Sequence, residues 1–288
     1  MKNRFLRHIQ FYNSSFIRIG WLYLLCIASL LSGSLLVCSQ KISFTTVAPP
    51  KESPFTLVTG ITQDALGYMW FTSGPVLYRY NGYEFITYKN NLLNPNSISN
   101  FNLDCVYADK SGLIWVGSSG AGLIRLDSRT GIFKHYRHNK SDALSIINDW
   151  VNTITEDHEG YIWVGTPEGL NRLDKQTGRF TRYVNDPEDQ TSLSEDYVGV
   201  VYEDQSGTIW VGTGDAFSIN QVRNRVSNKI RNREGGGLNR FDRKTGKFTR
   251  YLHNPKDPHS LIDNRVGAIC EDSHGVFWVG TAGDGLHS

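Results

Sequence analysis

The chain has 288 residues, of which 39% are apolar and 20% are charged, and its formal net charge is +2. This composition is typical of a globular protein and excludes a disordered one, and the length suffices for one large all-β domain. A charge so close to zero gives no support for nucleic-acid binding, which requires a clustered basic surface.

The N-terminal segment, residues 1–39, has the pattern of an export signal. Its first part carries four basic residues and no acidic one, and a nearly unbroken apolar run follows at residues 19–37. This order predicts a signal peptide that is cleaved after Ser39. Lipidation of Cys38 is a weaker alternative because Val37 is bulky, and an uncleaved membrane anchor is another, since about 19 apolar residues nearly span a bilayer. Each alternative exports the remainder of the chain, which we therefore expect in the periplasm.

Residues 40–54 form a short linker that contains three prolines. Within it, the segment SFTTV at residues 43–47 alternates well enough to form an additional edge strand. The repeats described next occupy residues 55–288, with an insertion at residues 215–234.

One stretch of sequence returns five times after residue 60. Its clearest copy is YIWVGTPEGLNRLD at residues 161–174, and successive copies place their tryptophans 45, 48, 47 and 68 residues apart. Self-similarity at such a period is the signature of a solenoid or a propeller. The five tryptophans are Trp70, Trp115, Trp163, Trp210 and Trp278.

The copy that begins at Val151 shows the internal structure of the repeat. Its segments VNTITED, YIWVGT, GLNRLD and RFTRYV read as strands that are separated by tight turns, and Gly178 supplies the positive φ of the third turn. A polar run, NDPEDQTSLSED, then leads to the next copy. Four short antiparallel strands and one longer return in about 47 residues predict a blade of an all-β propeller.

The repeat GxIWVGTxxGLNRLDxxTGxFxxY, with a loop such as NPKDPHSL at residues 254–261, resembles the two-component regulator propeller repeat over residues 55–286. The resemblance implies the extracytoplasmic sensor of hybrid histidine kinases of Bacteroidetes, with about seven blades per ring, an immunoglobulin-like domain, a transmembrane helix and a cytoplasmic kinase. About four and a half blades are present here, because Ser288 falls inside the third strand of the fifth copy. We therefore expect an incomplete propeller with open blade faces, from a longer protein or a truncated gene copy.

The cysteines give no metal or disulfide pattern. Cys26 and Cys38 lie in the apolar run, whereas Cys105 and Cys270 occupy different positions of distant repeats. Two buried free thiols are therefore expected in the propeller, and neither a metal nor another cofactor is predicted.

Residues that recur in every copy are predicted to build the blades. The tryptophans are expected to pack between blades. The pairs Glu156-Asp157, Glu203-Asp204 and Glu271-Asp272 resemble the paired acids of a glycosidase. However, each Asp begins a turn that ends in Gly, so its carboxylate is expected to accept backbone N–H groups there. No catalytic residue is therefore predicted.

Function is expected where the copies differ, on the face that carries the turn between the second and third strands. The residue at the start of each innermost strand differs from copy to copy. Aromatic faces beside an arginine suit the apolar face and the hydroxyl rim of a sugar. The alternative is that these residues only plug the top of the propeller channel. The residues are Asn102, Trp150, Tyr197 and Arg265.

The insertion at residues 215–234 lies in the same turn of the fourth copy. Apolar residues recur in it every three or four positions and basic residues fill the others, which predicts a short amphipathic helix with a basic outer face. Over the channel, such a helix would attract an acidic glycan. A solvated excursion or a contact to a second subunit is equally compatible. The basic residues that we assign to a ligand are Arg223, Arg225 and Lys229.

Three functions are compatible with these patterns. The first is a sensor that binds an oligosaccharide or polysaccharide fragment and signals, through the remaining blades, to a histidine kinase outside this chain. The second is a propeller hydrolase or lyase, which would need a singular pair of carboxylates facing the channel. The third is a non-catalytic propeller that binds another protein, and a homodimer is compatible with it. The resemblance favours the sensor.

Overall fold

The computed structural model describes residues 43–55, 57–94, 96–216, 235–282 and 285–288. The chain divides into two compact units, Met1–Ala48 and Pro49–Ser288, and the strands all lie in the second unit. In the described part, all regular secondary structure is β-strand, which confirms the all-β class. The predicted signal peptide or anchor, with Cys26 and Cys38, lies outside the described residues.

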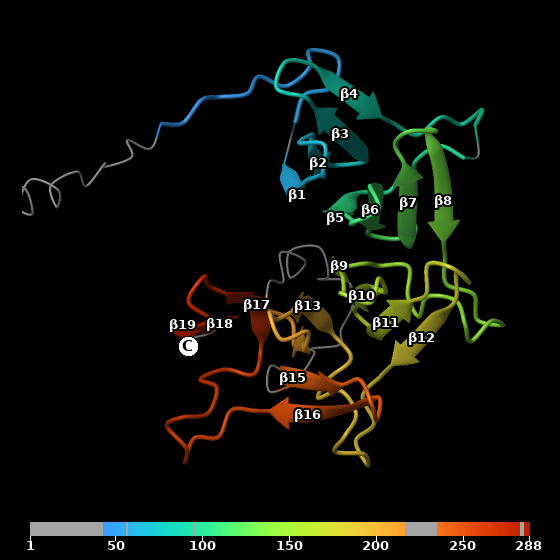
Figure 1. The fold of residues 1–288 in the computed structure, drawn as a ribbon. Coiled ribbons are helices and arrows are strands. Elements are labelled where there is room, and N and C mark those ends of the chain that lie inside the picture. The colour runs from blue at the N-terminus through green and yellow to red at the C-terminus, as the bar shows by residue number, and fades with distance from the viewer. Residues whose placement is uncertain (1–42, 56, 95, 217–234, 283–284) are drawn as a thin grey trace, which may run out of the picture. The chain divides into compact units, whose positions relative to one another are not determined.

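Five antiparallel sheets follow one another along the chain, and we number them blade 1 to blade 5 (Figure 1). Within each blade, every strand pairs with the strand that follows it in the sequence. This is the predicted order of a propeller blade. The strands of blades 1, 2 and 3 are β1 (Val58–Gln63), β2 (Met69–Ser73), β3 (Val76–Tyr80), β4 (Phe85–Tyr88), β5 (Leu103–Ala108), β6 (Leu113–Ser118), β7 (Leu123–Asp127), β8 (Ile132–Tyr136), β9 (Thr153–Glu156), β10 (Ile162–Thr166), β11 (Gly169–Leu173) and β12 (Phe180–Tyr183).

Blade 4 also has four strands, and blade 5 has three in the described part of the chain. The residues predicted as an insertion separate the second and third strands of blade 4. Of this insertion, residues 217–234 lie outside the described residues. The strands are β13 (Val198–Glu203), β14 (Ile209–Thr213), β15 (Gly237–Asp242), β16 (Lys247–Tyr251), β17 (Val266–Glu271), β18 (Phe277–Thr281) and β19 (Gly285–His287).

The tight turns between strands depend on glycine. Gly160 has a φ of 86° between β9 and β10, and Gly178 has a φ of 73° between β11 and β12. These values lie in the left-handed region, where glycine has no steric penalty. The positive φ predicted for Gly178 is therefore confirmed.

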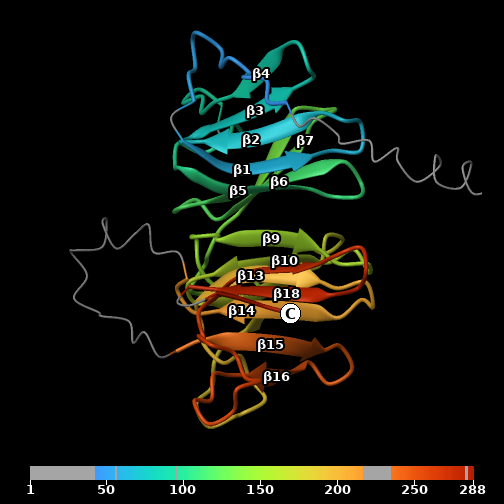
Figure 2. The ribbon, with the colours of Figure 1, turned by 90° about the vertical axis from the view of Figure 1, so that its left-hand side faces the viewer.

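The hydrophobic core lies between consecutive blades. Strand β10 is buried along its whole length, because neighbouring blades cover both of its faces. The innermost strands β9 and β13 contact each other and lie side by side in both Figure 1 and Figure 2. One cluster, between blades 2 and 3, contains Trp115, Leu123, Tyr136, Ile146, Val151, Ile154, Ile162, Val164, Leu173 and Phe180.

Each repeated tryptophan is tied to the repeated aspartate six residues before it. Trp163 is fully buried, and its indole N–H donates to Asp157 Oδ2 at 2.8 Å. The other carboxylate oxygen of Asp157 accepts the Tyr161 N–H at 2.9 Å, as predicted for a turn-capping aspartate. The matching pairs are Asp64–Trp70, Asp109–Trp115 and Asp204–Trp210, each at 2.8 Å, and Asp272–Trp278 at 3.1 Å.

The long return after each blade covers the outer edge of the next one. The Phe180 N–H donates to the Leu144 carbonyl at 2.9 Å, and the Phe248 N–H donates to the Thr191 carbonyl at 2.7 Å. The Arg182 guanidinium, on outer strand β12, donates to the Ser145 carbonyl at 2.8 Å. The contacts of Phe180 and Phe248 occupy backbone N–H groups of edge strands that would otherwise be free to pair with another chain.

Two expectations from the sequence need correction. Residues 43–47 form no strand, and the chain first joins a sheet at Val58. Ser53, which precedes this strand, nevertheless packs on blade 1, because its hydroxyl lies 2.9 Å from the Tyr78 hydroxyl. Cys105 and Cys270 are free thiols as expected, but Cys270 is exposed and Cys105 is only half-buried.

Neither a metal site nor a membrane-spanning helix occurs within the described residues. Their histidine, cysteine and acidic side chains form no group that could hold a metal ion. No helix within them has the length and apolar character needed to cross a membrane. The predicted anchor at residues 19–37 lies outside the described residues.

Candidate ligand-binding mouth

The four residues that differ between copies occupy one position of the blade. Asn102, Trp150, Tyr197 and Arg265, which we call the mouth residues, each precede a fully buried residue that begins the innermost part of the blade. In blades 2, 4 and 5 the strand register shifts immediately after this position. Such irregularities locally redirect a strand and its side chains. All four mouth residues are partly exposed.

In blades 2, 4 and 5 the mouth residue contacts the turn between the second and third strands of its own blade. The Ser119 N–H donates to the Asn102 carbonyl at 2.9 Å, and the Gly214 N–H donates to the Tyr197 carbonyl at 2.9 Å. In blade 5 the Ala282 N–H donates to the Arg265 carbonyl at 3.0 Å. The start of the innermost strand and this turn therefore lie on one face of the blades.

The same turn brings mouth residues of neighbouring blades together in pairs. Ser119 forms a β-bridge with Trp150, so it lies between Asn102 and Trp150. A Cβ atom placed on Gly214 would lie 2.9 Å from the Arg265 Cα atom, so Gly214 lies between Tyr197 and Arg265. Asn102 and Trp150 thus both contact Ser119, and Tyr197 and Arg265 both contact Gly214.

The charge of Arg265 is balanced by a neighbouring acid. Its guanidinium forms an ion pair with Asp263, and Nε lies 2.9 Å from Asp263 Oδ1. This hydrogen bond holds the pKa of Asp263 below its usual range, although partial burial acts in the opposite direction. Arg265 therefore stands in the mouth as an oriented hydrogen-bond donor within a neutral pair.

One aromatic residue of the mouth was missed by the sequence analysis. Phe101 is 49% exposed, and a Cβ atom on Gly120 would lie 2.8 Å from its ring. In blades 3, 4 and 5 the matching position holds a polar residue whose side chain accepts a backbone N–H group from the return before it. Asp149 Oδ1 accepts the His138 N–H at 2.6 Å, and Asp196 and Asn264 make the equivalent contacts. Phe101 departs from this pattern, and comparison of the copies would have found it.

The basic residues assigned to a ligand from the insertion, Arg223, Arg225 and Lys229, lie outside the described residues. The two ends of the insertion are described. β14 ends at Thr213 and β15 begins at Gly237, which places the insertion in the turn that contacts Tyr197 and Arg265.

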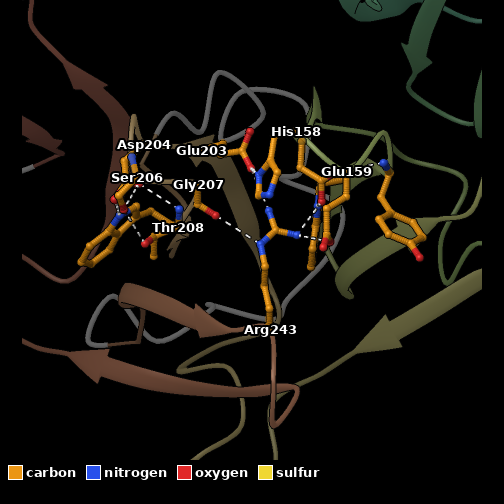
Figure 3. A network of polar contacts seen from close by, with 12 residues as sticks. His158, Glu159, Glu203, Asp204, Ser206, Gly207, Thr208 and Arg243 are labelled. Carbon is orange, nitrogen blue, oxygen red and sulfur yellow. Dashed lines mark hydrogen bonds and ion pairs between the residues drawn. The ribbon is translucent and has the colours of Figure 1, made fainter.

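A second polar cluster lies at the other end of the strands, where the turns contain the repeated aspartates. Arg243 follows strand β15, and its guanidinium bridges acidic residues of blades 3 and 4 (Figure 3). Its Nη1 lies 2.9 Å from Asp157 Oδ2 and its Nη2 lies 2.7 Å from Glu203 Oε1. Burial would lower the pKa of Arg243, but the hydrogen bond and charges of these carboxylates outweigh it and raise the pKa.

Lys175 repeats this arrangement between blades 2 and 3. Its Nζ lies 2.6 Å from Glu156 Oε1 and 3.2 Å from Asp109 Oδ2. Glu156 also accepts the Lys110 N–H at 2.8 Å, and Glu271 accepts the Gln205 N–H of the preceding blade at the same distance. The glutamates that resemble glycosidase acids are therefore contacts between blades. The sequence signal for this cluster is a basic residue directly after an aspartate that lies at or just past the end of the third strand.

Known proteins resemble this chain in its repeats. The two-component regulator propeller family matches residues 145–168, 192–215 and 260–283. Histidine kinase P4 of Formosa agariphila is 31% identical over 114 residues, which is 38% of this chain and 8% of that protein. The chain thus spans a small part of the length of this relative.

Solved structures show the same fold at low sequence identity. The extracellular domain assigned to a one-component system of B. thetaiotaomicron superposes with a TM-score of 0.56 at 18% identity, over 78% of this chain and 28% of that one. A catalytically inactive virginiamycin B lyase of Staphylococcus aureus, solved with quinupristin, superposes with a TM-score of 0.53 at 16% identity, over 78% of this chain and 63% of that one. In blades 3, 4 and 5 the chain therefore carries repeats that match the two-component regulator propeller family.

Proposed function

We propose that this chain belongs to the extracytoplasmic sensing region of a two-component signalling protein, and that its mouth residues recognise a carbohydrate. The proposal is carried by one observation: the residues that break the repeat are partly exposed and meet in pairs on one face of the blades. Scaffold residues of a repeat recur from copy to copy, so a position that varies on an accessible face is suited to ligand binding.

The chemistry of the mouth suits a sugar. Phe101, Trp150 and Tyr197 offer aromatic faces against which the C–H face of a sugar ring can pack. Asn102 offers both a donor and an acceptor to hydroxyl groups. Arg265 donates from a charge-balanced pair with Asp263, which suits neutral hydroxyl groups as well as acidic ones.

A hydrolase or lyase is less well supported. The carboxylates that resemble paired catalytic acids are held by Lys175, Arg243 and backbone N–H groups between blades. The likeness to virginiamycin B lyase is a likeness of fold, and one fold hosts many functions. We therefore infer a binding role without catalysis in this part of the protein.

The signalling partner that we propose is a histidine kinase. The relative from Formosa agariphila is itself a histidine kinase, and family repeats are present in the third, fourth and fifth blades here. Ligand binding between blades would bias their relative packing, which further blades would pass to the kinase. Export to the periplasm by residues 1–39 is part of this proposal.

The test is titration of the purified chain with a panel of neutral and acidic oligosaccharides by calorimetry. The double substitution Trp150→Ala/Tyr197→Ala should weaken the binding of any oligosaccharide that binds the wild type by at least about tenfold, because it removes two aromatic contacts. Tyr83→Ala, which removes an aromatic side chain that is 92% exposed on blade 1, is the matched control and should leave the affinity unchanged. Equal affinity of the double variant and the wild type would exclude the mouth as the binding site.

A further inference from the structure

A small pocket lies at the outer part of the junction between blades 2 and 3. Its volume is about 280 Å³, and it is lined by the end of β8, by the return that follows, and by the turn between β11 and β12. β8 and β12 are the outermost strands of their blades, whereas the mouth residues precede the innermost ones. This pocket, which we call the rim pocket, is thus separate from the mouth.

Three cationic side chains gather at the rim pocket. Arg137 and Arg179 line it, and both are exposed. Lys134 Nζ lies 4.7 Å from the centroid of the Tyr136 ring and would lie 3.2 Å from a Cβ atom on Gly178, which also lines the pocket. Within the part of the chain that the structure describes, none of the three cations forms an ion pair.

The acidic contribution to the pocket is small. Asp142 is the acidic residue of its lining, and its Oδ1 accepts the Leu144 N–H at 2.9 Å. The guanidinium of Arg182 also donates to the Asp142 carbonyl at 2.9 Å, which adds a further cation beside the return. The rim pocket therefore has an excess of positive charge.

A buried hydroxyl group accompanies these charges. Tyr136 lines the pocket and is 6% exposed, and its hydroxyl oxygen has no hydrogen-bond partner among the described residues. His135 Nδ1 is likewise buried and unpaired within them, while its Nε2 lies 3.1 Å from the Ser97 carbonyl. A tyrosine hydroxyl can donate to an anionic oxygen, so the Tyr136 hydroxyl favours a ligand that accepts hydrogen bonds.

The three cations of the rim pocket are not repeated at the neighbouring blade junctions. At the junction of blades 3 and 4, the positions of Lys134, Arg137 and Arg179 are occupied by Thr181, Val184 and Lys247. At the junction of blades 1 and 2 they are occupied by Ile86, Lys89 and Ile132. Each of those junctions has one cation where this one has three. A blade junction therefore does not require these charges.

We propose that the rim pocket binds an oxyanion, either a free phosphate or the carboxylate of an acidic sugar. Arginine guanidinium groups bind both kinds of oxyanion through two parallel N–H···O bonds. The small volume of the pocket suits a single charged group and excludes a long oligosaccharide. This site is independent of the mouth and of the function proposed for it.

The test is calorimetric titration of the full chain with inorganic phosphate and with glucuronate, and with glucose as an uncharged comparison. Phosphate or glucuronate should bind with millimolar affinity, and glucose should not bind. Arg137→Gln/Arg179→Gln should weaken anion binding by at least about tenfold, since it removes two charged donors. Tyr136→Phe, which deletes only the hydroxyl group, should weaken it by a smaller factor.

The matched control is Lys247→Gln, which removes one charge at the equivalent position of the next junction and should leave anion affinity unchanged. The single variant Arg137→Gln, at an exposed position, serves if the double variant does not fold. Binding of phosphate alone supports a free anion, and binding of glucuronate alone supports an acidic sugar. The proposal is overturned if neither anion binds the wild type, if glucose binds as well as glucuronate, or if the arginine variants keep full affinity.

Discussion

Blade 1 and blade 3 share an isoleucine and a valine at matching positions of their innermost segments, but of the two only blade 3 has a described blade on each side. Ile154 of blade 3 is 8% exposed, whereas the matching Ile61 of blade 1 is 62% exposed. Val151 is 0% exposed and the matching Val58 is 47% exposed. A blade is therefore a unit whose apolar faces are complete only when a neighbour packs on them. Most of the stability of a blade should come from its neighbours.

The largest expected difference concerns the tryptophans. Trp163 is fully buried, stacks on Tyr183 and bonds to Asp157, whereas Trp278 of blade 5 is only partly buried. Trp163→Ala should lower the free energy of unfolding by about 3–5 kcal/mol. Trp278→Ala should lower it by less than half as much. Urea denaturation followed by circular dichroism measures both losses. Equal losses would mean that coverage by neighbours does not determine the contribution of a blade.

The matching residues Ile154 and Ile61 test how much the apolar face of a blade contributes to stability. Ile154→Ala creates a cavity between blades and should cost about 2–4 kcal/mol of unfolding free energy. Ile61→Ala deletes the same atoms from an exposed face and should cost no more than about 0.5 kcal/mol. The same denaturation experiment compares the two. If Ile61→Ala proves as costly as Ile154→Ala, a further segment or molecule covers the face of blade 1 in solution.

The repeated aspartates make blade stability sensitive to acid. Burial alone would raise the pKa of Asp109, but hydrogen bonds from Ser111, Trp115 and the Leu113 N–H, with the charge of Lys175, outweigh burial and lower it. Because the folded pKa lies below the unfolded value of about 3.9, the stabilisation is present at neutral pH and is lost as the pH falls below about 4.

Asp109→Asn should therefore cost about 2 kcal/mol at pH 7, since a charged hydrogen-bond acceptor is removed from a buried turn. Its cost should shrink as the pH falls toward 3, where the wild-type carboxylate becomes protonated. Asp272→Asn, in the exposed turn of blade 5, is the matched control and should have the smaller effect. A cost of Asp109→Asn that stays constant from pH 7 to pH 3 would show that its charge contributes nothing.

The sequence predicted the fold well because a repeat reveals its own period. Trp163 and Asp157 recur with fixed spacing, and both the strands and the turn-capping role of the aspartate followed from that spacing. The bond from the aspartate to the indole did not follow, because nothing in a local pattern shows that two side chains six residues apart meet across a hairpin. Lys175 and Arg243 were missed for a similar reason, since one acidic partner of each lies in the preceding blade.

The candidate sites were predicted only in part. The variable position at Trp150 and Tyr197 was visible in the sequence, but its pairing through Ser119 and Gly214 depends on how blades pack. Phe101 was overlooked because only the position next to it was compared. The rim pocket was invisible, because Arg137 and Arg179 belong to different copies and meet only at a junction.

The two propeller cysteines extend the comparison to blade 5. Cys270 lies in the innermost strand of blade 5 and is exposed, whereas Cys105 is half-buried and its Sγ lies 3.8 Å from the Val151 carbonyl oxygen of the next blade. Burial, with the nearby charge of Asp104, raises the pKa of the Cys105 thiol, although a backbone hydrogen bond acts in the opposite direction. The thiolate is the reactive form, so Cys105 should remain unreactive at neutral pH.

Iodoacetamide at pH 7.5 should therefore alkylate Cys270 at least about tenfold faster than Cys105, because Cys270 is exposed whereas burial raises the pKa of the Cys105 thiol. Peptide mapping by mass spectrometry follows each cysteine on its own tryptic peptide. Denaturation in urea is the control and should bring the two rates together, since it removes both burial and the neighbouring blade. Slow alkylation of Cys270 in the folded protein would indicate that another blade or subunit covers blade 5 in solution, so that the open face of this blade is not accessible.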